Sequence, residues 1–174
     1  MVSGLFLSTL AIAYLALLFA VAFYGERKVG GEHRAMLLTR ALDGWNDLDS
    51  LLDEWPQLSD AQHRAILSAC GQLGRHLHSV GQVHGCFYPK HIFLQATGDG
   101  YAAQLIDLEK TRPLLFGWRD RVKDLEPLLR RARPWSDVQV RQLLAAYLDQ
   151  PEDSALVATW YQRLNARRSH KENR

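Results

Sequence analysis

Residues 84–107, HGCFYPKHIFLQATGDGYAAQLID, decide how the rest of this chain is interpreted. The apolar run Ile92-Phe93-Leu94 predicts a short strand, and Tyr101–Ile106 predicts the strand that returns beside it. Between them, Thr97-Gly98-Asp99-Gly100 supplies residues that tolerate the positive φ of a two-residue turn. The stretch therefore predicts a loop followed by a small β-hairpin.

This hairpin brings an imidazole and a carboxylate together. If the turn is centred near Gly98-Asp99 or Asp99-Gly100, His91 falls almost opposite Asp107. Directly opposed residues lie roughly 5 Å apart at Cβ, and diagonal ones roughly 7–8 Å. One divalent cation could be held between the two side chains, and the alternative is a structural hydrogen bond at the hairpin end.

The order of these elements resembles that of protein kinase-like enzymes, which place a catalytic loop, a short hairpin and a metal-binding Asp in succession. The strings HGCFYPKHIFL and LIDLEK resemble the lipopolysaccharide kinases of the WaaP and InaA type, in which a His stands where other kinases have Asn. The resemblance implies that His91 and Asp107 bind Mg²⁺ and that Lys90 lies near the phosphates of ATP. Cys86 departs from the kinase pattern, because an Asp normally receives the proton of the acceptor hydroxyl. A thiol with a pKa of about 8.5 is a poor base at neutral pH.

The catalytic candidates are therefore Cys86, Lys90 and Asp107. The resemblance also assigns the segment upstream of the loop. It makes Ala35–Leu38 the last strand of the small lobe, and Ala41, Leu42 and Asp43 the hinge that contacts the adenine of ATP.

Helical spacing dominates the remainder of the chain. Ser59 predicts the start of a long helix, with Gln62 as its capping-box partner, and Gly81 predicts its end. The apolar stripe of this helix consists of Ile66, Cys70, Leu73, Leu77 and Val80. His76 and His78 lie off the stripe and are expected to be solvated.

A short helix in WNDLDSLLDEW, residues 45–55, is expected before Ser59, and three more helices are expected after the hairpin. Asp124 lies on the first, in KDLEPLLRR, where the resemblance implies that it braces the catalytic loop. The alternative is an exposed network of charge pairs at i,i+4 spacing. Ser136 predicts the cap of the next helix, and Glu152–Ala166 is the last. Residues 167–174 form a charged tail.

The amino-terminal stretch Gly4–Tyr24 carries no charge, and as a helix it would be roughly 31 Å long, which suits a hydrocarbon core of about 30 Å. Arg27 and Lys28 follow it, so the positive-inside rule places the amino terminus outside and the bulk of the chain in the cytoplasm. The expectation is a single-pass protein of the inner membrane. A buried core helix and a signal peptide are the alternatives, although no basic residue precedes the apolar run.

Composition narrows the class of protein. The 174 residues are 47% hydrophobic and 23% charged, which is typical of a folded domain. The net charge of +2 and the lack of a basic stripe argue against nucleic acid as a partner. Cys70 and Cys86 are not at metal-ligand spacing and fit a reducing compartment.

The predicted fold is mainly α with a small β-hairpin: a protein kinase-like C-terminal lobe preceded by a single transmembrane helix. The expected division is residues 1–28 for the transmembrane helix and its flank, 29–34 for a linker, 35–166 for the large lobe and 167–174 for the tail.

Two functions follow from this interpretation. The resemblance implies an ATP- and Mg²⁺-dependent kinase whose acceptor is the lipopolysaccharide core or another sugar, with the membrane as a partner. Ten residues between the span and the hinge strand cannot build a small lobe with its glycine-rich loop, Lys and Glu. Impaired activity is therefore expected, and the alternative is a membrane-anchored, non-catalytic pseudokinase module or a truncated or fused gene product.

Overall fold

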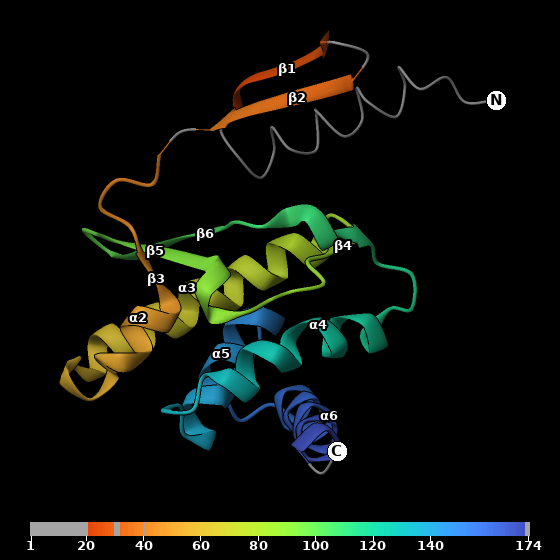
Figure 1. The fold of residues 1–174 in the computed structure, drawn as a ribbon. Coiled ribbons are helices and arrows are strands. Elements are labelled where there is room, and N and C mark those ends of the chain that lie inside the picture. The colour runs from red at the N-terminus through yellow and green to blue at the C-terminus, as the bar shows by residue number, and fades with distance from the viewer. Residues whose placement is uncertain (1–20, 30–31, 40, 173–174) are drawn as a thin grey trace. The chain divides into compact units, whose positions relative to one another are not determined.

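The computed structural model describes the backbone of residues 21–29, 32–39 and 41–172, and it divides the chain into two units, 1–43 and 44–174. In the first unit, strand β1 (Val21–Val29) pairs antiparallel with β2 (Glu32–Thr39), as Figure 1 shows. The pairing runs from Val21 opposite Thr39 to Val29 opposite Glu32. The described part of this unit is therefore a β-hairpin.

The predicted transmembrane helix is wrong. Residues 21–24 of the predicted span lie in β1, and residues 4–20 lie outside the described residues. No helix in the described ranges is both long enough and apolar enough to cross a membrane. The β-branched and aromatic residues at the end of the run, Val21, Phe23 and Tyr24, favour a strand, and the prediction gave more weight to the length of the run and its lack of charge. The predicted location in the inner membrane rested on this helix and stays a prediction.

The segment predicted as a linker, residues 29–34, contains the end of β1 and the start of β2. Val29 and residues 32–34 therefore belong to two paired strands. The boundary between the two units falls after Asp43, within the segment predicted as the hinge.

The second unit is mainly helical. Its helices are α2 (Leu48–Asp53), α3 (Asp60–Ser79), α4 (Trp118–Arg131), α5 (Asp137–Leu148) and α6 (Ala155–Glu172). Its 3₁₀ turns are η1 (Trp55–Gln57), η2 (Pro89–His91) and η3 (Leu108–Lys110). Its strands are β3 (Asn46–Asp47), β4 (Gln82–Val83), β5 (Ile92–Thr97), β6 (Gly100–Leu105) and β7 (Arg112–Pro113).

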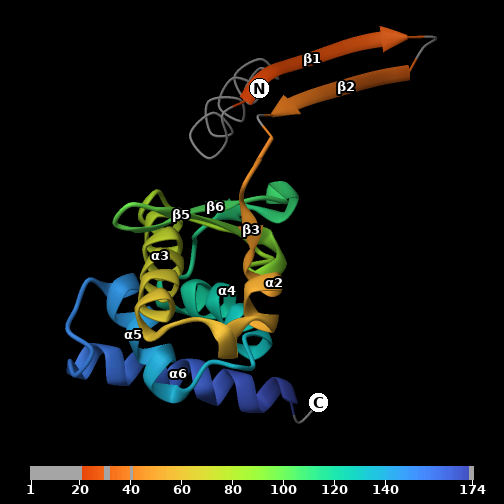
Figure 2. The same ribbon diagram turned by 90° about the vertical axis from the view of Figure 1, so that its left-hand side faces the viewer.

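The hairpin predicted from residues 92–106 is confirmed. β5 and β6 pair from Ile92 opposite Leu105 to Thr97 opposite Gly100, which leaves Gly98-Asp99 as the two-residue turn. The short strand β3 pairs with the other edge of β5, so the sheet has the order β3-β5-β6. In Figures 1 and 2 the helices of this unit lie on one face of the sheet, with α3 next to it and packed against β6.

Side-chain caps fix where the helices begin. The predicted capping box of α3 is present: the Gln62 N–H donates to Ser59 Oγ (3.3 Å), and the Ser59 N–H donates to Gln62 Oε1 (2.9 Å). Ser136 and Gln139 repeat the arrangement at the start of α5. Each box satisfies amide groups that a helix start leaves without partners.

Helices α3 and α5 approach each other closely at Gly71. A Cβ placed on Gly71 would lie 2.5 Å from the Leu143 carbonyl oxygen and 2.9 Å from the Ala146 Cβ. Those distances are too short for real atoms, so a side chain at Gly71 would push the two helices apart. At Gly74, one turn further on, the nearest atom would be 3.4 Å away, which is an ordinary contact.

We expect Gly71→Ala to lower the free energy of unfolding by about 1–3 kcal/mol, because overpacking outweighs the roughly 1 kcal/mol by which alanine favours a helix. Gly74→Ala is the matched control and is expected to be neutral or slightly stabilising. Urea denaturation followed by circular dichroism measures both. Equal destabilisation by the two substitutions would contradict the close crossing at Gly71.

Candidate functional site

The candidate site is built on the loop between β4 and β5 and on Asp107, which follows β6. His84 anchors the loop: it is fully buried, its Nε2 donates to the Ile106 carbonyl oxygen (2.9 Å), and its Nδ1 accepts from the Cys86 N–H (3.3 Å). Burial lowers the pKa of His84, which favours the neutral ring that these two hydrogen bonds require. His84 therefore has a structural role.

His91 and Asp107 meet at the open end of the hairpin, as the position of the turn predicted. Nε2 of His91 lies 3.2 Å from Oδ2 of Asp107, and Nδ1 of His91 lies 2.9 Å from the Cys86 carbonyl oxygen. A carbonyl oxygen only accepts, so Nδ1 carries the hydrogen and Nε2 of the neutral ring is an acceptor. Nε2 then faces a carboxylate oxygen that is also an acceptor. A proton on Nε2 or a metal ion bound to both atoms satisfies the pair.

The backbone of Asp107 has an unusual conformation. Its φ of 60° and ψ of 53° place it in the left-handed region, and the other described non-glycine residue with positive φ, Asp149, ends helix α5. Aspartate is several-fold enriched in this region. Backbone strain of this kind costs of order 1–3 kcal/mol and is concentrated at functional sites. Here it occurs at the junction of β6 and η3, beside the His91 ring.

The donor set fits Mg²⁺ bound together with phosphates. In the described part of the chain, no group of three or more His, Cys, Asp or Glu side chains could hold a metal ion. Mg²⁺ is usually bound through one or two carboxylates, keeps several waters and completes its octahedron with substrate phosphates, so Asp107 is the stronger of the two ligands and the His91 imidazole the weaker. The 3.2 Å separation of the His91 and Asp107 donor atoms is close to the roughly 3 Å between neighbouring ligands of an octahedron with bonds of 2.0–2.1 Å.

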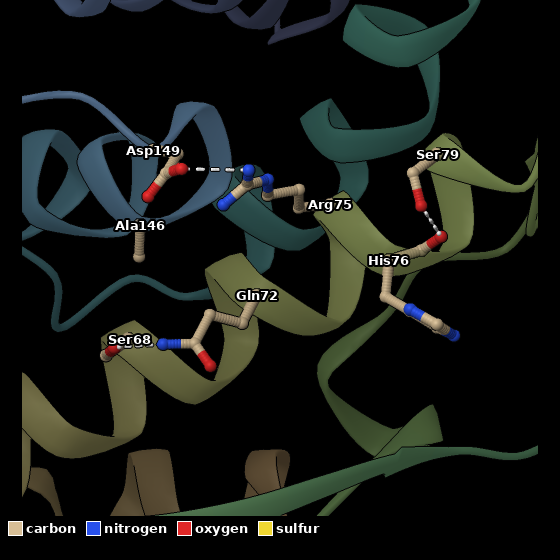
Figure 3. A pocket seen from close by; sticks show the side chains of 7 residues that line it. All are labelled: Ser68, Gln72, Arg75, His76, Ser79, Ala146 and Asp149. Carbon is tan, nitrogen blue, oxygen red and sulfur yellow. Dashed lines mark hydrogen bonds and ion pairs between the residues drawn. The ribbon is translucent and has the colours of Figure 1, made fainter.

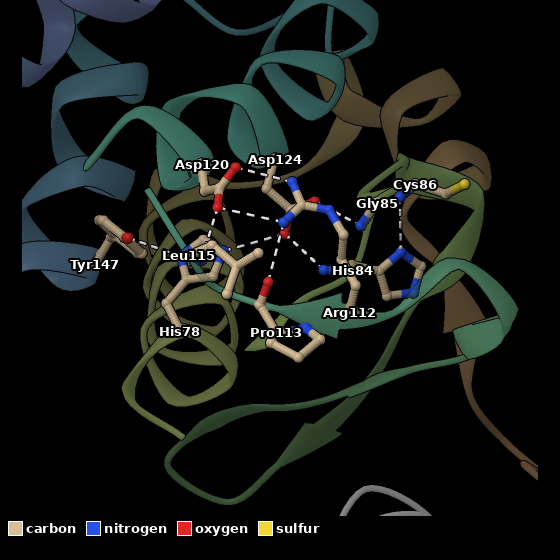
Figure 4. Close-up of polar contacts among 10 residues, drawn as sticks. All are labelled: His78, His84, Gly85, Cys86, Arg112, Pro113, Leu115, Asp120, Asp124 and Tyr147. Atoms are coloured by element: carbon tan, nitrogen blue, oxygen red, sulfur yellow. Dashed lines mark hydrogen bonds and ion pairs between the residues drawn. The ribbon is translucent and has the colours of Figure 1, made fainter. Parts of the chain in front are cut away.

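Asp124 on α4 holds the loop through two backbone amides. Its Oδ1 accepts from the Gly85 N–H (2.7 Å), and its Oδ2 accepts from the His84 N–H (2.8 Å). Figure 4 shows the carboxylate pointing at these two amides, and its side chain is almost completely buried. Of the two roles left open for Asp124, bracing of the loop is confirmed.

The expectation that His78 is solvated is wrong. His78 is buried, its Nε2 lies 3.1 Å from Oδ2 of Asp124, and its Nδ1 lies 2.7 Å from the Tyr147 hydroxyl oxygen (Figure 4). Burial raises the pKa of Tyr147, so its hydroxyl keeps its proton. In the neutral ring, Nε2 donates to Asp124 and Nδ1 accepts from Tyr147. The two hydrogen bonds link α5, α3, α4 and the loop.

The sequence carries a signal for the buried face of α3 on which His78 lies. Gly71, Gly74 and His78 follow one another at spacings of three and four, which places them on one face of α3. Because the first two are glycines, a search for apolar side chains overlooks this face.

The other predicted site residues differ in how far the structure supports them. Cys86 is buried in the loop, and its carbonyl oxygen orients the His91 ring. Lys90 is exposed on η2, so its role near the phosphates stays a prediction. Residues 41–43 belong to the first unit, whose place relative to the loop is not described, and their contact with adenine also stays a prediction.

Sequence reasoning missed a basic cleft beside the loop. The cleft has a volume of about 380 Å³, is bordered by Gly85 and Tyr88 of the loop, and contains three carboxylates that already accept hydrogen bonds. Its cationic side chains are Lys110, Arg112, Lys123, Arg130, Arg167 and Lys171. An adjoining hollow of about 580 Å³ shares Arg130 and Lys171 and adds Arg131 and Arg133. The cations come from separate segments of the chain, so no single stretch of the sequence indicates that they form a cleft.

A third hollow, of about 440 Å³, lies over α3 and α5 (Figure 3). Its one arginine, Arg75, is paired with Asp149 at 2.9 Å, and Gln72 donates to Ser68 at 3.0 Å. The exposed His76 also borders it, as expected for a solvated residue. Its polar groups are largely paired with one another, and we assign no chemistry to it.

Known proteins resemble this chain in sequence and in fold. The model of the Lipopolysaccharide kinase (Kdo/WaaP) family matches residues 7–147. Protein InaA of Escherichia coli (strain K12) is 33% identical over 118 residues, which cover 60% of this chain and 53% of InaA, so the chain spans about half the length of that relative. A solved structure described as "WaaP in complex with acyl carrier protein" superposes with a TM-score of 0.68 over 92% of this chain and 75% of that chain, at 22% identity. That likeness shows a kinase-like fold.

The family match begins at residue 7 instead of at Ala35. It therefore includes the stretch that was predicted to cross the membrane, and the expectation that the resemblance is confined to residues 35–166 is wrong.

Proposed function

Because this chain belongs to the lipopolysaccharide kinase (Kdo/WaaP) family, we propose that it carries out ATP-dependent phosphorylation of a sugar hydroxyl of the lipopolysaccharide core. The observation that carries the proposal is the His91–Asp107 pair, in which two acceptor atoms lie 3.2 Å apart on a braced loop. A metal ion bound to both atoms is one of the two arrangements that satisfy such a pair, and a kinase supplies that ion with its nucleotide.

His91 and Asp107 would hold the Mg²⁺, which, when bound, neutralises charge on the transferred phosphoryl group. The residues around them keep the two donors in place. The Cys86 carbonyl oxygen fixes the His91 tautomer and aims Nε2 at the site, and such outer contacts are typical of metal-binding histidines. Asp124 holds the loop backbone through the two amides of His84 and Gly85.

The basic cleft would bind the acceptor. It borders the loop through Gly85 and Tyr88, and its arginine and lysine side chains suit an acceptor that carries phosphate or carboxylate groups. Arg131 stacks its guanidinium over the Tyr88 ring at 3.9 Å from the ring centroid, which ties the end of α4 to the loop.

Cys86 argues for slow turnover. Its buried thiol stands where the base is expected, and a thiol accepts a proton poorly at neutral pH. Phosphoryl transfer depends mainly on positioning and charge, so a slow reaction without a strong base is consistent with this site. The second candidate function, a pseudokinase that binds nucleotide without transferring phosphate, is favoured by the same thiol.

A transfer assay with radiolabelled ATP, Mn²⁺ and lipopolysaccharide core as acceptor tests the proposal. We expect incorporation at a rate below the usual kinase range of about 1–100 s⁻¹, and loss of incorporation in Asp107→Asn. The matched control Asp99→Asn lies in the hairpin turn and should leave the rate unchanged. Incorporation that survives Asp107→Asn would contradict the site, whereas nucleotide binding without any transfer would favour the pseudokinase.

A further inference from the structure

An apolar loop projects from the second unit between β7 and α4. The side chains of Leu115, Phe116 and Trp118 are 69%, 67% and 45% exposed, in the sequence Leu-Leu-Phe-Gly-Trp at residues 114–118. Large exposed hydrophobic side chains are few in the described part of the chain, and half of them lie in this one loop. A cluster of this kind marks an interaction site or an aggregation hazard.

The loop is held in one shape by a buried carboxylate. Oδ2 of Asp120 accepts from the N–H groups of Leu115 and Phe116, each at 2.9 Å, and Arg112 donates to both carboxylate oxygens at 3.2 and 2.8 Å. Figure 4 shows Arg112 and Leu115 converging on Asp120. The hydrogen bond from Arg112 keeps the pKa of Asp120 well below its usual range, so the carboxylate stays charged. The exposed side chains are therefore presented on an ordered backbone.

A further exposed apolar side chain, Val80, lies near this loop. The Leu114 N–H donates to the Gly81 carbonyl oxygen at 2.8 Å, which brings the loop beside the end of α3. Val80, the residue before Gly81, is 45% exposed there. Val80 is therefore one more exposed apolar side chain near the loop.

Two arginines lie against Trp118. The guanidinium carbons of Arg163 and Arg119 lie 4.3 and 5.5 Å from the centre of the Trp118 ring. Arg112 adjoins the loop and also lines the basic cleft. Asp120 at the start of α4 is buried and paired with Arg112, so Arg119 and Arg163 are the charged side chains that the structure places against Trp118.

We propose that residues 114–118 insert into the surface of an anionic lipid bilayer. Leu115 and Phe116 would enter the boundary of the acyl chains, while Trp118, Arg119 and Arg163 would lie at the level of the headgroups. Apolar side chains beside arginines, with a tryptophan between them, are the combination that binds lipid interfaces, since burial of apolar area and attraction to anionic headgroups add together. The arginines beside Trp118, Arg119 and Arg163, favour an anionic lipid surface as the partner.

Lipid-dependent quenching tests this in the full chain. Phe116→Cys, labelled with a polarity-sensitive fluorophore, is mixed with vesicles of phosphatidylcholine containing roughly one-third phosphatidylglycerol, an anionic surface. Cys70 and Cys86 are buried, so the label goes to the new cysteine. We expect a blue-shifted emission and quenching by spin labels on the acyl chains. Val138→Cys is the matched control, since Val138 is 60% exposed on α5, outside the loop, and its label should stay unquenched.

Binding is also expected to depend on the lipid composition of the vesicles. Vesicles of phosphatidylcholine alone should give little quenching at position 116, and the double variant Leu115→Ser/Phe116→Ser should bind anionic vesicles at least about tenfold more weakly than the native chain. The proposal is overturned if the native chain does not bind anionic vesicles. It is also overturned if the chain binds while the label at position 116 stays unquenched, because another segment then makes the contact and this loop serves a protein partner instead.

Discussion

Asp124→Ala is expected to lower the free energy of unfolding by about 3–5 kcal/mol, because it removes one member of a buried, charged hydrogen-bond network. The carboxylate accepts hydrogen bonds from His78 and from the amides of His84 and Gly85. All three donors lose their partner in the variant. His78 and His84 are buried, so their N–H groups are left without water, whereas Gly85 borders the basic cleft. The loss should loosen the loop that carries Cys86 and His91.

Two measurements check this. Denaturant unfolding gives the change in stability, and hydrogen exchange should show faster exchange of the His84 and Gly85 amides than in the native chain. The matched control is Asp60→Ala in the first turn of α3, because the Asp60 side chain is 91% exposed and its removal should cost less than about 1 kcal/mol. A cost for Asp124→Ala as small as that of the control would mean that the loop is held by its other contacts.

The hairpin could be predicted from sequence because its determinants are local. Two short apolar runs and a Gly-Asp turn fix both the strands and their register, and the register brings His91 to Asp107. The same holds for the helix starts at Ser59 and Ser136, where the cap and its partner are three residues apart.

The network under the loop could not be predicted in full because its members come from distant segments. His78 and Tyr147 are 69 residues apart, and His78 and Asp124 are 46 apart. Helical periodicity finds one apolar stripe for a helix, whereas α3 is buried on two sides, toward β6 and toward α5. The polar residue on the second side looked solvated because its neighbours on that face are glycines.

The amino-terminal unit shows a different limit of sequence reasoning. A long uncharged run is typical of a membrane helix, and hydropathy alone does not reveal that its last residues, 21–24, lie in a strand. The pairing of β1 with β2 is a contact between two strands, and composition alone does not reveal it. The basic cleft was missed for a related reason, since a net charge of +2 for the whole chain says nothing about where the cations gather.

Asp107→Asn is expected to abolish the stabilisation of the chain by Mn²⁺ and ATP. A ligand that binds only the native state raises the free energy of unfolding by RT ln(1 + [L]/Kd), which is about 2.7 kcal/mol at a hundredfold excess over Kd. For a chain of this size, that corresponds to a rise in Tm of roughly 5–10 °C. Mn²⁺ is the sharper probe because it accepts imidazole ligands more readily than Mg²⁺.

The substitution removes the charge of Asp107 and keeps its backbone conformation. Asparagine adopts the left-handed conformation as readily as aspartate. The Asp107 side chain is 39% exposed and, among the described residues, its ion pair is with His91, so the variant without ligand should stay within about 1 kcal/mol of the native chain. Differential scanning fluorimetry with and without Mn²⁺ and ATP measures the shift. Asp99→Asn, the same change in the exposed hairpin turn, should keep the full shift. A shift that persists in Asp107→Asn would place the cation elsewhere and leave the His91–Asp107 pair as a proton-bridged contact at the hairpin end.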